Sequence, residues 1–168
     1  MMLKKISNAV FTVRNLWVVI GTIAVYTALS AILAYSGIKL SKISGSSMEP
    51  TLYDGDITIS IESGDYEAGD IVSFISPQGD GSRWIKRVIG VPGDVVEIYG
   101  DYLEVNGVPD EISLKYNKVG KKSTKRGSIV LLLGEYFLSG DNREVSLDSR
   151  YVGAINEELI LSEMLFSY

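Results

Sequence analysis

Three serines fall within four positions in the stretch "SGSSMEPTL", residues 44–52. A serine hydroxyl attacks a carbonyl carbon effectively only when a neighbouring base takes its proton. The chain contains no histidine, which excludes a Ser-His-Asp triad and leaves a lysine amine or a carboxylate as the base. The residues alone fit either a nucleophile or an ordinary polar turn, and they do not choose among Ser44, Ser46 and Ser47.

Lysine is the base better matched to acyl transfer, provided that its amine is neutral. A pKa near 8 lies two to three units below the usual value of about 10.4, a shift of about 3 to 4 kcal/mol that burial can supply. Lys86, in "WIKRVIGV", has large apolar neighbours. On a strand Lys86 shares one face with Trp84 and Val88 and opposes Arg87, so its amine can point inward. The alternative is an edge strand along which the Lys86 stem lies on the surface.

Polar side chains are also dense in "SGDNREVSLDSR", residues 139–150. If the chain is extended from Ser146, the side chains of Ser146, Asp148 and Arg150 project to the same side. That arrangement would set a hydroxyl beside an Asp/Arg ion pair. The alternative is a polar loop with an ion pair on its surface.

Composition excludes several classes of function. The absence of cysteine rules out disulfides, thiolate zinc sites and cysteine nucleophiles. Residues 39–168 carry 13 basic and 21 acidic side chains, a net charge of −8, which argues against nucleic acid as a partner. No metal or cofactor is implied, because no cluster of oxygen ligands has suitable spacing.

An uncharged segment near the N-terminus predicts a transmembrane helix at residues 16–38. As a helix its 23 residues extend about 34 Å, enough for a hydrocarbon core of about 30 Å. A cleaved signal peptide is the alternative, but its apolar core would be about 7 to 15 residues long. Lys4, Lys5 and Arg14 precede the segment, so residues 1–15 are expected in the cytoplasm and residues 39–168 on the extracytoplasmic face. The localisation expected is a single-pass protein of the cytoplasmic membrane, with the lipid bilayer as a partner.

Beyond residue 39 the pattern predicts a mostly β fold, an antiparallel sandwich or partly closed barrel. Short apolar stretches alternate with Gly, Pro, Asp and Asn, and a hairpin is expected around Gly100 and Asp101. Residues 115–127, with six cations, are expected to form a flexible basic loop. The C-terminal residues 155–168 are expected to pack as a strand or short helix. The predicted strands are "DITISIE", "DIVSFIS", "RWIKRVIGV", "DVVEIYG", "YLEVNG", "SIVLLLG" and "EYFLSG".

In this order and spacing, the motifs resemble those of the bacterial type I signal peptidases. The resemblance covers essentially the whole chain, and the short length is similar to the Gram-positive members. Besides the N-terminal apolar segment it rests on "SGSSMEPTLYDGD" (44–56), "AGDIVSF" (68–74), "WIKRVIGVPGD" (84–94) and "GDNREVSLDSRYVG" (140–153).

The resemblance implies a membrane-anchored serine endopeptidase with a mostly antiparallel β body. Ser47 would be the nucleophile, and Lys86 the general base that activates it and later the deacylating water. Ser146 would orient the lysine amine, Asp148 and Arg150 would form a supporting ion pair, and residues 140–143 would shape the adjacent wall.

The implied substrates are secreted precursor proteins, whose signal peptides are removed by cleavage after a small-x-small pattern such as A-x-A. An extended substrate would dock as an added strand with alternate side chains in pockets. The residues expected to line the first pocket are Ile43, Met48, Leu52, Trp84 and Ile85.

The resemblance specifies the hydrogen-bond donors to the oxyanion less completely than it specifies the nucleophile and the base. The Ser47 N–H is the natural first donor. Long Gram-negative members carry a serine two positions before the nucleophile, where this chain has Gly45. A backbone amide or the hydroxyl of Ser44 or Ser46 therefore stays open as the second donor.

Two alternatives to general signal-peptide removal fit the same residues. One is a specialised Ser/Lys processing peptidase that serves a pilus or a conjugative system. The other is a membrane-tethered relative that binds extended segments in the same groove and does not cut them.

Overall fold

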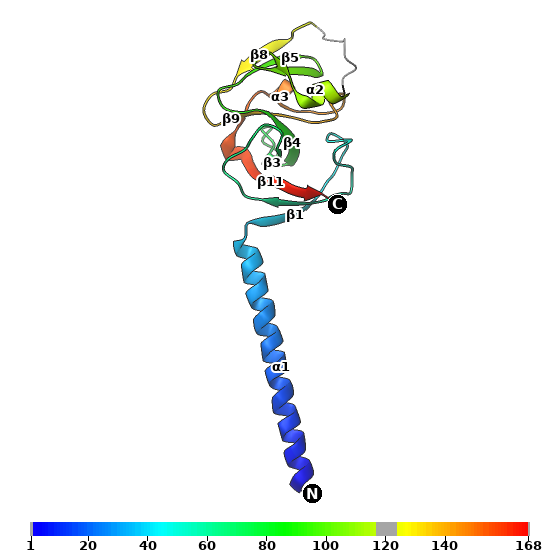
Figure 1. Ribbon diagram of the computed structural model, residues 1–168, viewed down its shortest axis with the longest axis vertical. Coiled ribbons are helices and arrows are strands. Elements are labelled where there is room, and N and C mark those ends of the chain that lie inside the picture. Colours follow the sequence, from blue (N-terminus) through cyan, green and yellow to red (C-terminus); the bar gives the residue numbers. More distant parts are fainter. Residues whose placement is uncertain (1, 117–123, 168) are drawn as a thin grey trace. The chain divides into compact units, whose positions relative to one another are not determined.

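The computed structural model describes residues 2–116 and 124–167, in two compact units that divide after Ile38. Figure 1 labels the elements of both units. Each unit is described by itself below.

The N-terminal unit is a single long helix, α1 (Met2–Tyr35). Its segment Asn15–Ile32 is apolar and long enough to cross a membrane. The helix ends at Tyr35, three residues before the predicted end of the span, because Gly37 adopts a left-handed backbone (φ 67°) and β1 begins at Ile38. The predicted span and the observed helix therefore coincide over residues 16–35.

The second unit is mostly β and antiparallel, which confirms the predicted fold class. Its larger sheet has seven strands and curls into a half-barrel, in the order β1-β2-β11-β3-β4-β9-β10. The strands are β1 (Ile38–Lys42), β2 (Ile57–Ile61), β3 (Ile71–Ile75), β4 (Arg83–Gly90), β9 (Glu135–Ser139), β10 (Ile155–Asn156) and β11 (Ile160–Ser167).

A smaller sheet of four strands packs beside the first, in the order β7-β6-β5-β8. The predicted hairpin is present, since Tyr99 pairs with Tyr102 and leaves Gly100 and Asp101 as the turn. The strands are β5 (Val95–Tyr99), β6 (Tyr102–Val105), β7 (Val108–Pro109) and β8 (Gly127–Val130).

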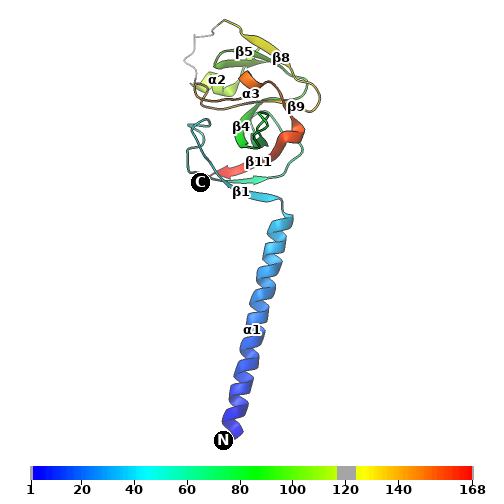
Figure 2. The same cartoon turned by 180° about the vertical axis from the view of Figure 1, so that it is seen from behind.

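Short helices complete the second unit. They are α2 (Glu111–Tyr116), α3 (Ser149–Val152) and the 3-10 turn η1 (Glu157–Leu159). Seen from either side, α3 and β9 lie between the smaller sheet and β11 (Figure 2). The segment that joins β9 to α3 therefore runs where the two sheets meet.

Close packing at this junction depends on Gly90, at the end of β4. A Cβ atom there would lie 2.8 Å from Val96 Cγ2 and 2.9 Å from Leu131 Cδ1. Both neighbours belong to the apolar cluster under the smaller sheet. A side chain at position 90 would thus push the two sheets apart.

Three sequence predictions need correction. The expected basic loop 115–127 begins inside α2 and ends in β8, and its residues 117–123 lie outside the described part of the chain. The strand predicted over 128–134 stops at Val130. The chain is not extended from Ser146, because α3 starts at Ser149 with Asp148 as its N-cap.

Candidate active site

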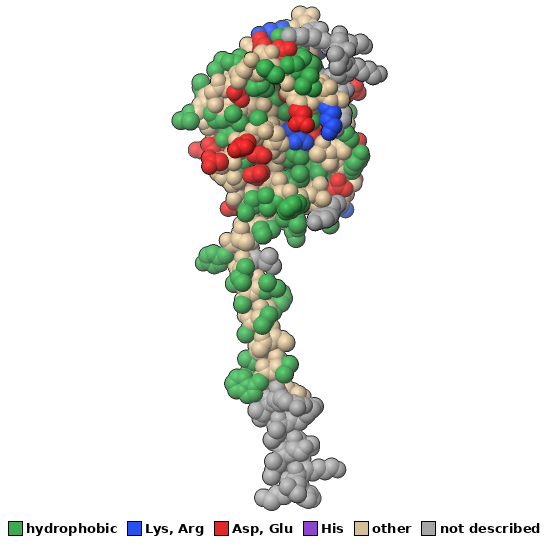
Figure 3. Space-filling view, in the orientation of Figure 1, with side chains coloured by type: hydrophobic (Ala, Val, Ile, Leu, Met, Phe, Trp, Pro, Cys, Tyr) green, Lys and Arg blue, Asp and Glu red, His purple; other side chains and the backbone are tan. Residues whose placement is uncertain are grey.

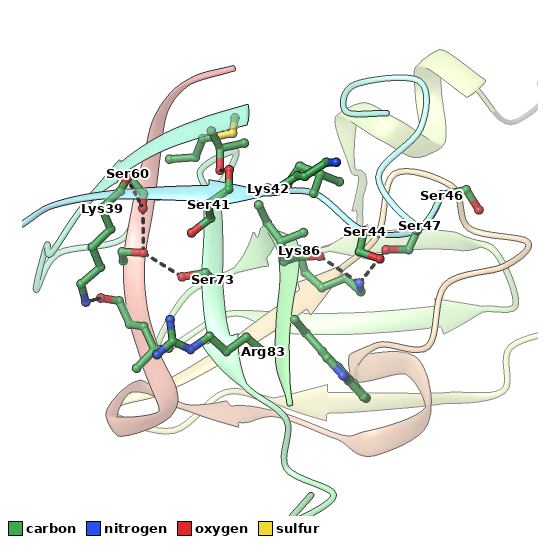
Figure 4. A pocket seen from close by; sticks show the side chains of 18 of the residues that line it. Lys39, Ser41, Lys42, Ser44, Ser46, Ser47, Ser60, Ser73, Arg83 and Lys86 are labelled. Atoms are coloured by element: carbon green, nitrogen blue, oxygen red, sulfur yellow. Dashed lines mark hydrogen bonds between the residues drawn. The ribbon is translucent and has the colours of Figure 1, made fainter. Parts of the chain in front are cut away.

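A lysine amine on β4 and a serine hydroxyl in the loop between β1 and β2 meet beside the larger sheet. Lys86 Nζ donates a hydrogen bond to Ser47 Oγ over 2.8 Å and a second to the Ile85 carbonyl over 2.9 Å (Figure 4). Lys86 is 5% exposed and Ser47 is half-buried. Of the three serines in the motif, Ser47 is therefore the one bonded to the lysine.

The strand register explains why Lys86 points inward. Val72 pairs with Lys86 and Phe74 with Trp84 across β3 and β4. Val72, Phe74 and Val88 belong to one buried apolar cluster, against which Trp84 packs. Lys86 therefore lies on the apolar face of β4, as the alternation of its neighbours predicts.

Apolar surroundings change the protonation of Lys86. Burial disfavours the ammonium form and is the largest cause of a lowered pKa. The Asp148 carboxylate opposes this change and Arg150 reinforces it, so the pKa of Lys86 is lowered to about 8. At pH 7 about a tenth of the amine is then neutral, compared with well under 1% at a pKa of about 10.4.

The loop that carries Ser47 is fixed at both ends. Ile43 N donates to Asp56 O at 2.8 Å, and Gly55 N donates back to Ile43 O at 3.0 Å. The segment after β9 holds the middle, since Asn142 N donates to Ser47 O at 3.0 Å and its side-chain amide donates to Ser46 O at 3.1 Å. The two motifs thus meet beside the hydroxyl through one backbone hydrogen bond and one from the Asn142 side chain.

Asp148 and Arg150 form a buried ion pair, although by a different geometry from the one predicted. Asp148 caps α3 by accepting from Arg150 N, and its carboxylate accepts from Arg150 Nε at 2.8 Å. Burial opposes ionisation of Asp148, but hydrogen bonds from Arg150 and from Gly140 N keep its pKa below the usual value. Asp148 is therefore an anion close to the lysine at neutral pH.

Ser146 lies in the same place but does not bond to the lysine in this structure. It is 4% exposed, and its Oγ has no hydrogen-bond partner of good geometry among the described residues, although it lies near enough to the Asp148 carboxylate to help lower the pKa of Asp148. A Cβ atom on Gly140 would lie 2.3 Å from Ser146 Oγ and 2.4 Å from the Ser47 carbonyl oxygen. Only glycine therefore allows the 140–146 segment to approach the serine loop this closely.

A second ion pair stabilises the other side of the loop that carries Ser47. It was not predicted from the sequence. Arg87 donates Nε to Asp141 Oδ1 at 2.9 Å and one terminal nitrogen to Oδ2 at 2.7 Å. The Thr51 hydroxyl donates to the same carboxylate. Arg87 therefore faces away from Lys86, as expected, and links β4 to both motifs.

The smaller sheet is tied to this region by two further pairs. Arg143 donates to Asp110 Oδ1 at 2.7 Å, and Arg150 donates to Asp101 Oδ1 at 2.8 Å. Both carboxylates lie more than 30 residues from their partners in the chain. No local pattern in the sequence indicates either pair.

A groove of about 680 Å³ runs from Ser47 and Lys86 across one face of the larger sheet. Of the five expected pocket residues, Ile43, Trp84 and Ile85 line it. Met48 and Leu52 are fully buried and pack behind Ile43 and Ile85, so they support the wall without forming its surface.

The loop geometry narrows the choice of oxyanion donors. Gly45 N already donates to Asp54 Oδ1 at 2.8 Å. The Ser46 hydroxyl points away from Lys86 (Figure 4). The Ser47 N–H and the Ser44 hydroxyl stay as candidates, and both border the groove.

Comparisons with known proteins give the family. A family model described as "Signal peptidase, peptidase S26" matches residues 14–168. Signal peptidase IB of Staphylococcus aureus is 39% identical over 145 residues, which cover 75% of each chain. Signal peptidase I of Bacillus amyloliquefaciens is 35% identical over 162 residues, which cover 87% of this chain and 81% of its own.

A crystal structure of a signal peptidase I from Enterococcus faecalis V583 is 31% identical, with a TM-score of 0.49 over 60% of this chain and 97% of that one. The family model spans nearly all of the chain, and both sequence relatives align over at least three quarters of it. The chain therefore belongs to the signal peptidase family, peptidase S26, and is a serine peptidase of the type I signal peptidase class.

Proposed function

We propose that the protein removes signal peptides from secreted precursors by acyl transfer to Ser47, with Lys86 as the general base. The observation that carries the proposal is the 2.8 Å separation between Lys86 Nζ and Ser47 Oγ, at a buried amine whose pKa is lowered to about 8. About a tenth of a base with that pKa is neutral at pH 7, and the neutral form is the one that general base catalysis requires.

The reaction proceeds in two stages. In the first, Ser47 Oγ attacks the scissile carbonyl carbon while its proton passes to Lys86 Nζ, and the resulting ammonium then protonates the leaving amine. The first product departs and leaves an ester on Ser47. In the second, the neutral Lys86 amine takes a proton from water, whose oxygen attacks the ester carbon. The bond from that carbon to Ser47 Oγ then breaks, the Lys86 ammonium returns the proton to Ser47 Oγ, and the cleaved signal peptide leaves as a carboxylic acid.

Two positions in the loop are proposed as oxyanion donors, the Ser47 N–H and the Ser44 hydroxyl. Loss of one such donor costs about a hundredfold to a thousandfold in kcat. We expect Ser44→Ala to show a loss of that kind, and Ser46→Ala, whose hydroxyl points away, to cost little. Equal losses in the two variants would contradict the assignment of Ser44.

Ser146 is proposed to orient the lysine. Its buried Oγ has no hydrogen-bond partner among the described residues, and such a group gains free energy by accepting a bond from the neutral Lys86 amine once Ser47 is acylated and no longer pairs with that amine. Asp148, Arg150 and the wall at residues 140–143 then hold Ser146 in place.

The substrate is proposed to bind as a strand along β4. In the described residues β9 pairs with β4 only from Arg87 onward, so the outer edge of β4 over residues 83–86 is open to a peptide. The apolar wall of Ile43 and Ile85 suits a small residue directly before the scissile bond. The residue two positions earlier projects to the same side of the substrate strand, which supports a small-x-small pattern.

Membrane attachment is proposed through the apolar part of α1, with the second unit outside the cytoplasm. Exposed apolar side chains on β1, β2 and β11 offer a further contact with lipid, namely Leu40, Ile57, Leu165 and Phe166. Figure 3 shows apolar side chains gathered over this region of the second unit. A protease added outside intact cells should digest the second unit, and full protection would contradict the orientation.

The decisive experiment is digestion of a purified preprotein by the full chain in detergent or vesicles, with fragment masses measured. Ser47→Ala and Lys86→Met should each abolish cleavage, whereas Ser128→Ala, at an exposed position of β8, should cleave normally. Normal cleavage by Lys86→Met would refute the mechanism. Binding of the preprotein by the wild-type chain without cleavage would favour the non-catalytic alternative.

A further inference from the structure

An aromatic ring lies beside the amine of Lys86. Lys86 Nζ lies over the indole of Trp84, 5.9 Å from the ring centroid. The two side chains share one face of β4, because they are two residues apart on the strand. A cation within about 6 Å of an aromatic centroid is attracted by the ring quadrupole, and this attraction depends on the charge. The Trp84 ring can therefore distinguish the ammonium form of Lys86 from the neutral amine.

Phe74 fixes the orientation of this indole. Phe74 pairs with Trp84 across β3 and β4, and the two rings meet edge to face, with centroids 5.9 Å apart and planes at 80°. Phe74 is fully buried, in the apolar cluster against which Trp84 packs. The same pair of strands thus positions both the amine and the aromatic face beside it.

Few charges act on the Lys86 amine, so the contribution of the ring is measurable. The Asp148 carboxylate raises the pKa of Lys86, and the Arg150 guanidinium lowers it together with burial. The neighbouring residues on β3, Val72 and Phe74, carry no charge. A change in the electrostatics of the indole alone would therefore alter one contribution and leave the others in place.

We propose that Trp84 is a positioning residue for the general base, whose ring stabilises the Lys86 ammonium that forms as Ser47 gives up its proton. The inference rests on the proposed function and deepens it. On the alkaline side the resting amine is neutral and gains little from the ring, whereas the amine that has taken the proton from Ser47 Oγ is a cation in a buried site. Because the contact is stronger during the attack than before it, it accelerates acylation.

The pH dependence of this effect distinguishes it from simple packing. Below the pKa of Lys86 the resting enzyme already carries the ammonium, and the ring stabilises it there as much as during the attack. Weakening the ring contact should therefore lower kcat/KM on the alkaline plateau and change it little at pH 6. A loss of packing would lower kcat/KM by the same factor at every pH.

The test is fluorination of the Trp84 ring, which weakens the quadrupole and nearly preserves the shape. The chain has two tryptophans, so in Trp17→Phe, a substitution in α1, incorporated fluorotryptophans occupy position 84 alone. Along a series of mono-, di- and trifluorinated indoles, the midpoint of the acid limb of kcat/KM should fall stepwise, by about half a unit in total. The plateau should fall by up to about threefold, the rate equivalent of half a pKa unit.

Substitutions provide a second series. Trp84→Phe keeps a smaller aromatic face and Trp84→Leu removes it, so the acid limb should move further in Trp84→Leu than in Trp84→Phe. Phe166→Leu removes an exposed ring of β11 that does not border the groove, and the acid limb should stay in place.

Fluorescence tests the contact without relying on cleavage. In Trp17→Phe the emission of Trp84 should titrate with a midpoint near 8, the pKa of Lys86, and Lys86→Met should abolish that titration. If the emission titrates in this way and no peptide is cut, the proposed function fails while the contact between ring and amine stands.

Two results would overturn the proposal. One is an acid limb that stays in place along the fluorinated series. The other is a kcat/KM that falls by the same factor at every pH, which would reduce Trp84 to a wall of the groove.

Discussion

Replacing Asp148 by Asn should increase the neutral fraction of Lys86, the proposed general base, at low pH. The Asp148 carboxylate raises the pKa of Lys86, while burial and Arg150 lower it, with a result of about 8. Asn keeps the shape and can still accept from Gly140 N, but the anion is lost and the Arg150 cation stays. We expect the pKa of Lys86 to fall by about one further unit.

The magnitude follows from the neutral fraction of the amine. At pH 6 a lysine with a pKa of about 8 is about 1% neutral, and one with a pKa of about 7 is about 9% neutral. The kcat/KM at pH 6, relative to the alkaline plateau, should therefore rise about ninefold in Asp148→Asn. The assay is kcat/KM for one peptide from pH 5.5 to 9.5, where the acid limb should move its midpoint from about 8 to about 7.

The substitution also breaks a buried ion pair, so the free energy of unfolding should fall by about 3 kcal/mol. Denaturant unfolding curves, measured at several temperatures, identify a temperature at which the variant is still folded during the assay. Glu158→Gln, at an exposed carboxylate on η1, should leave the acid limb where it is. An acid limb that stays at pH 8 or moves upward in Asp148→Asn would refute the electrostatic assignment.

Three further predictions follow from the same site. Lys86→Met should raise the free energy of unfolding relative to wild type by about 3 kcal/mol more at pH 7 than at pH 10.5. The reason is that burial disfavours the Lys86 ammonium only in the folded state. This cost to wild-type stability is complete below pH 8 and absent above about 10.4. Equal differences at the two pH values, by denaturant unfolding, would contradict this. Gly140→Ala should lower kcat at least about a hundredfold, since its Cβ displaces the Ser47 carbonyl. Gly64→Ala, whose Cβ meets nothing within 4 Å, should leave kcat unchanged. Equal kcat values in the two variants would count against the close approach of Gly140 to the Ser47 carbonyl. Arg87→Lys loses the two-pronged contact with Asp141 and should destabilise the fold by about 1 to 3 kcal/mol, and an unchanged unfolding midpoint would show that the pair is not needed.

Most of the strands and the inward face of Lys86 could be predicted because their signals are local. Alternation in "WIKRV" sets the inward face of Lys86, and the turn residues between Tyr99 and Tyr102 set the hairpin. The choice of Ser47 came from the resemblance to the family. Composition gave no reason to prefer it, and the 2.8 Å contact with Lys86 now supplies one.

The features that could not be predicted depend on short or distant elements. Helix α3 has four residues, too few for a periodic pattern, so the Asp148 cap was interpreted as part of a strand. The partners of Arg143 and Arg150 lie 33 and 49 residues away. The hydrogen-bonded serines Ser60, Ser162 and Ser73 had a weak signal, because each interrupts an apolar strand, but only the sheet order brings them together.

The smaller sheet matters to the chemistry because acidic residues beside its strands bind two arginines of the segment 140–150. Arg150 is held by Asp101, in the turn between β5 and β6, and at the same time by Asp148. Arg143 is held by Asp110, before α2, and donates to the Gly140 carbonyl at 2.8 Å. Two arginines thus anchor both ends of the 140–150 segment to a sheet that contributes no residue to the groove. That segment also carries Asp148, which raises the pKa of Lys86, and Arg150, which lowers it, so the contacts with the smaller sheet help to fix the positions of two charges that act on the amine.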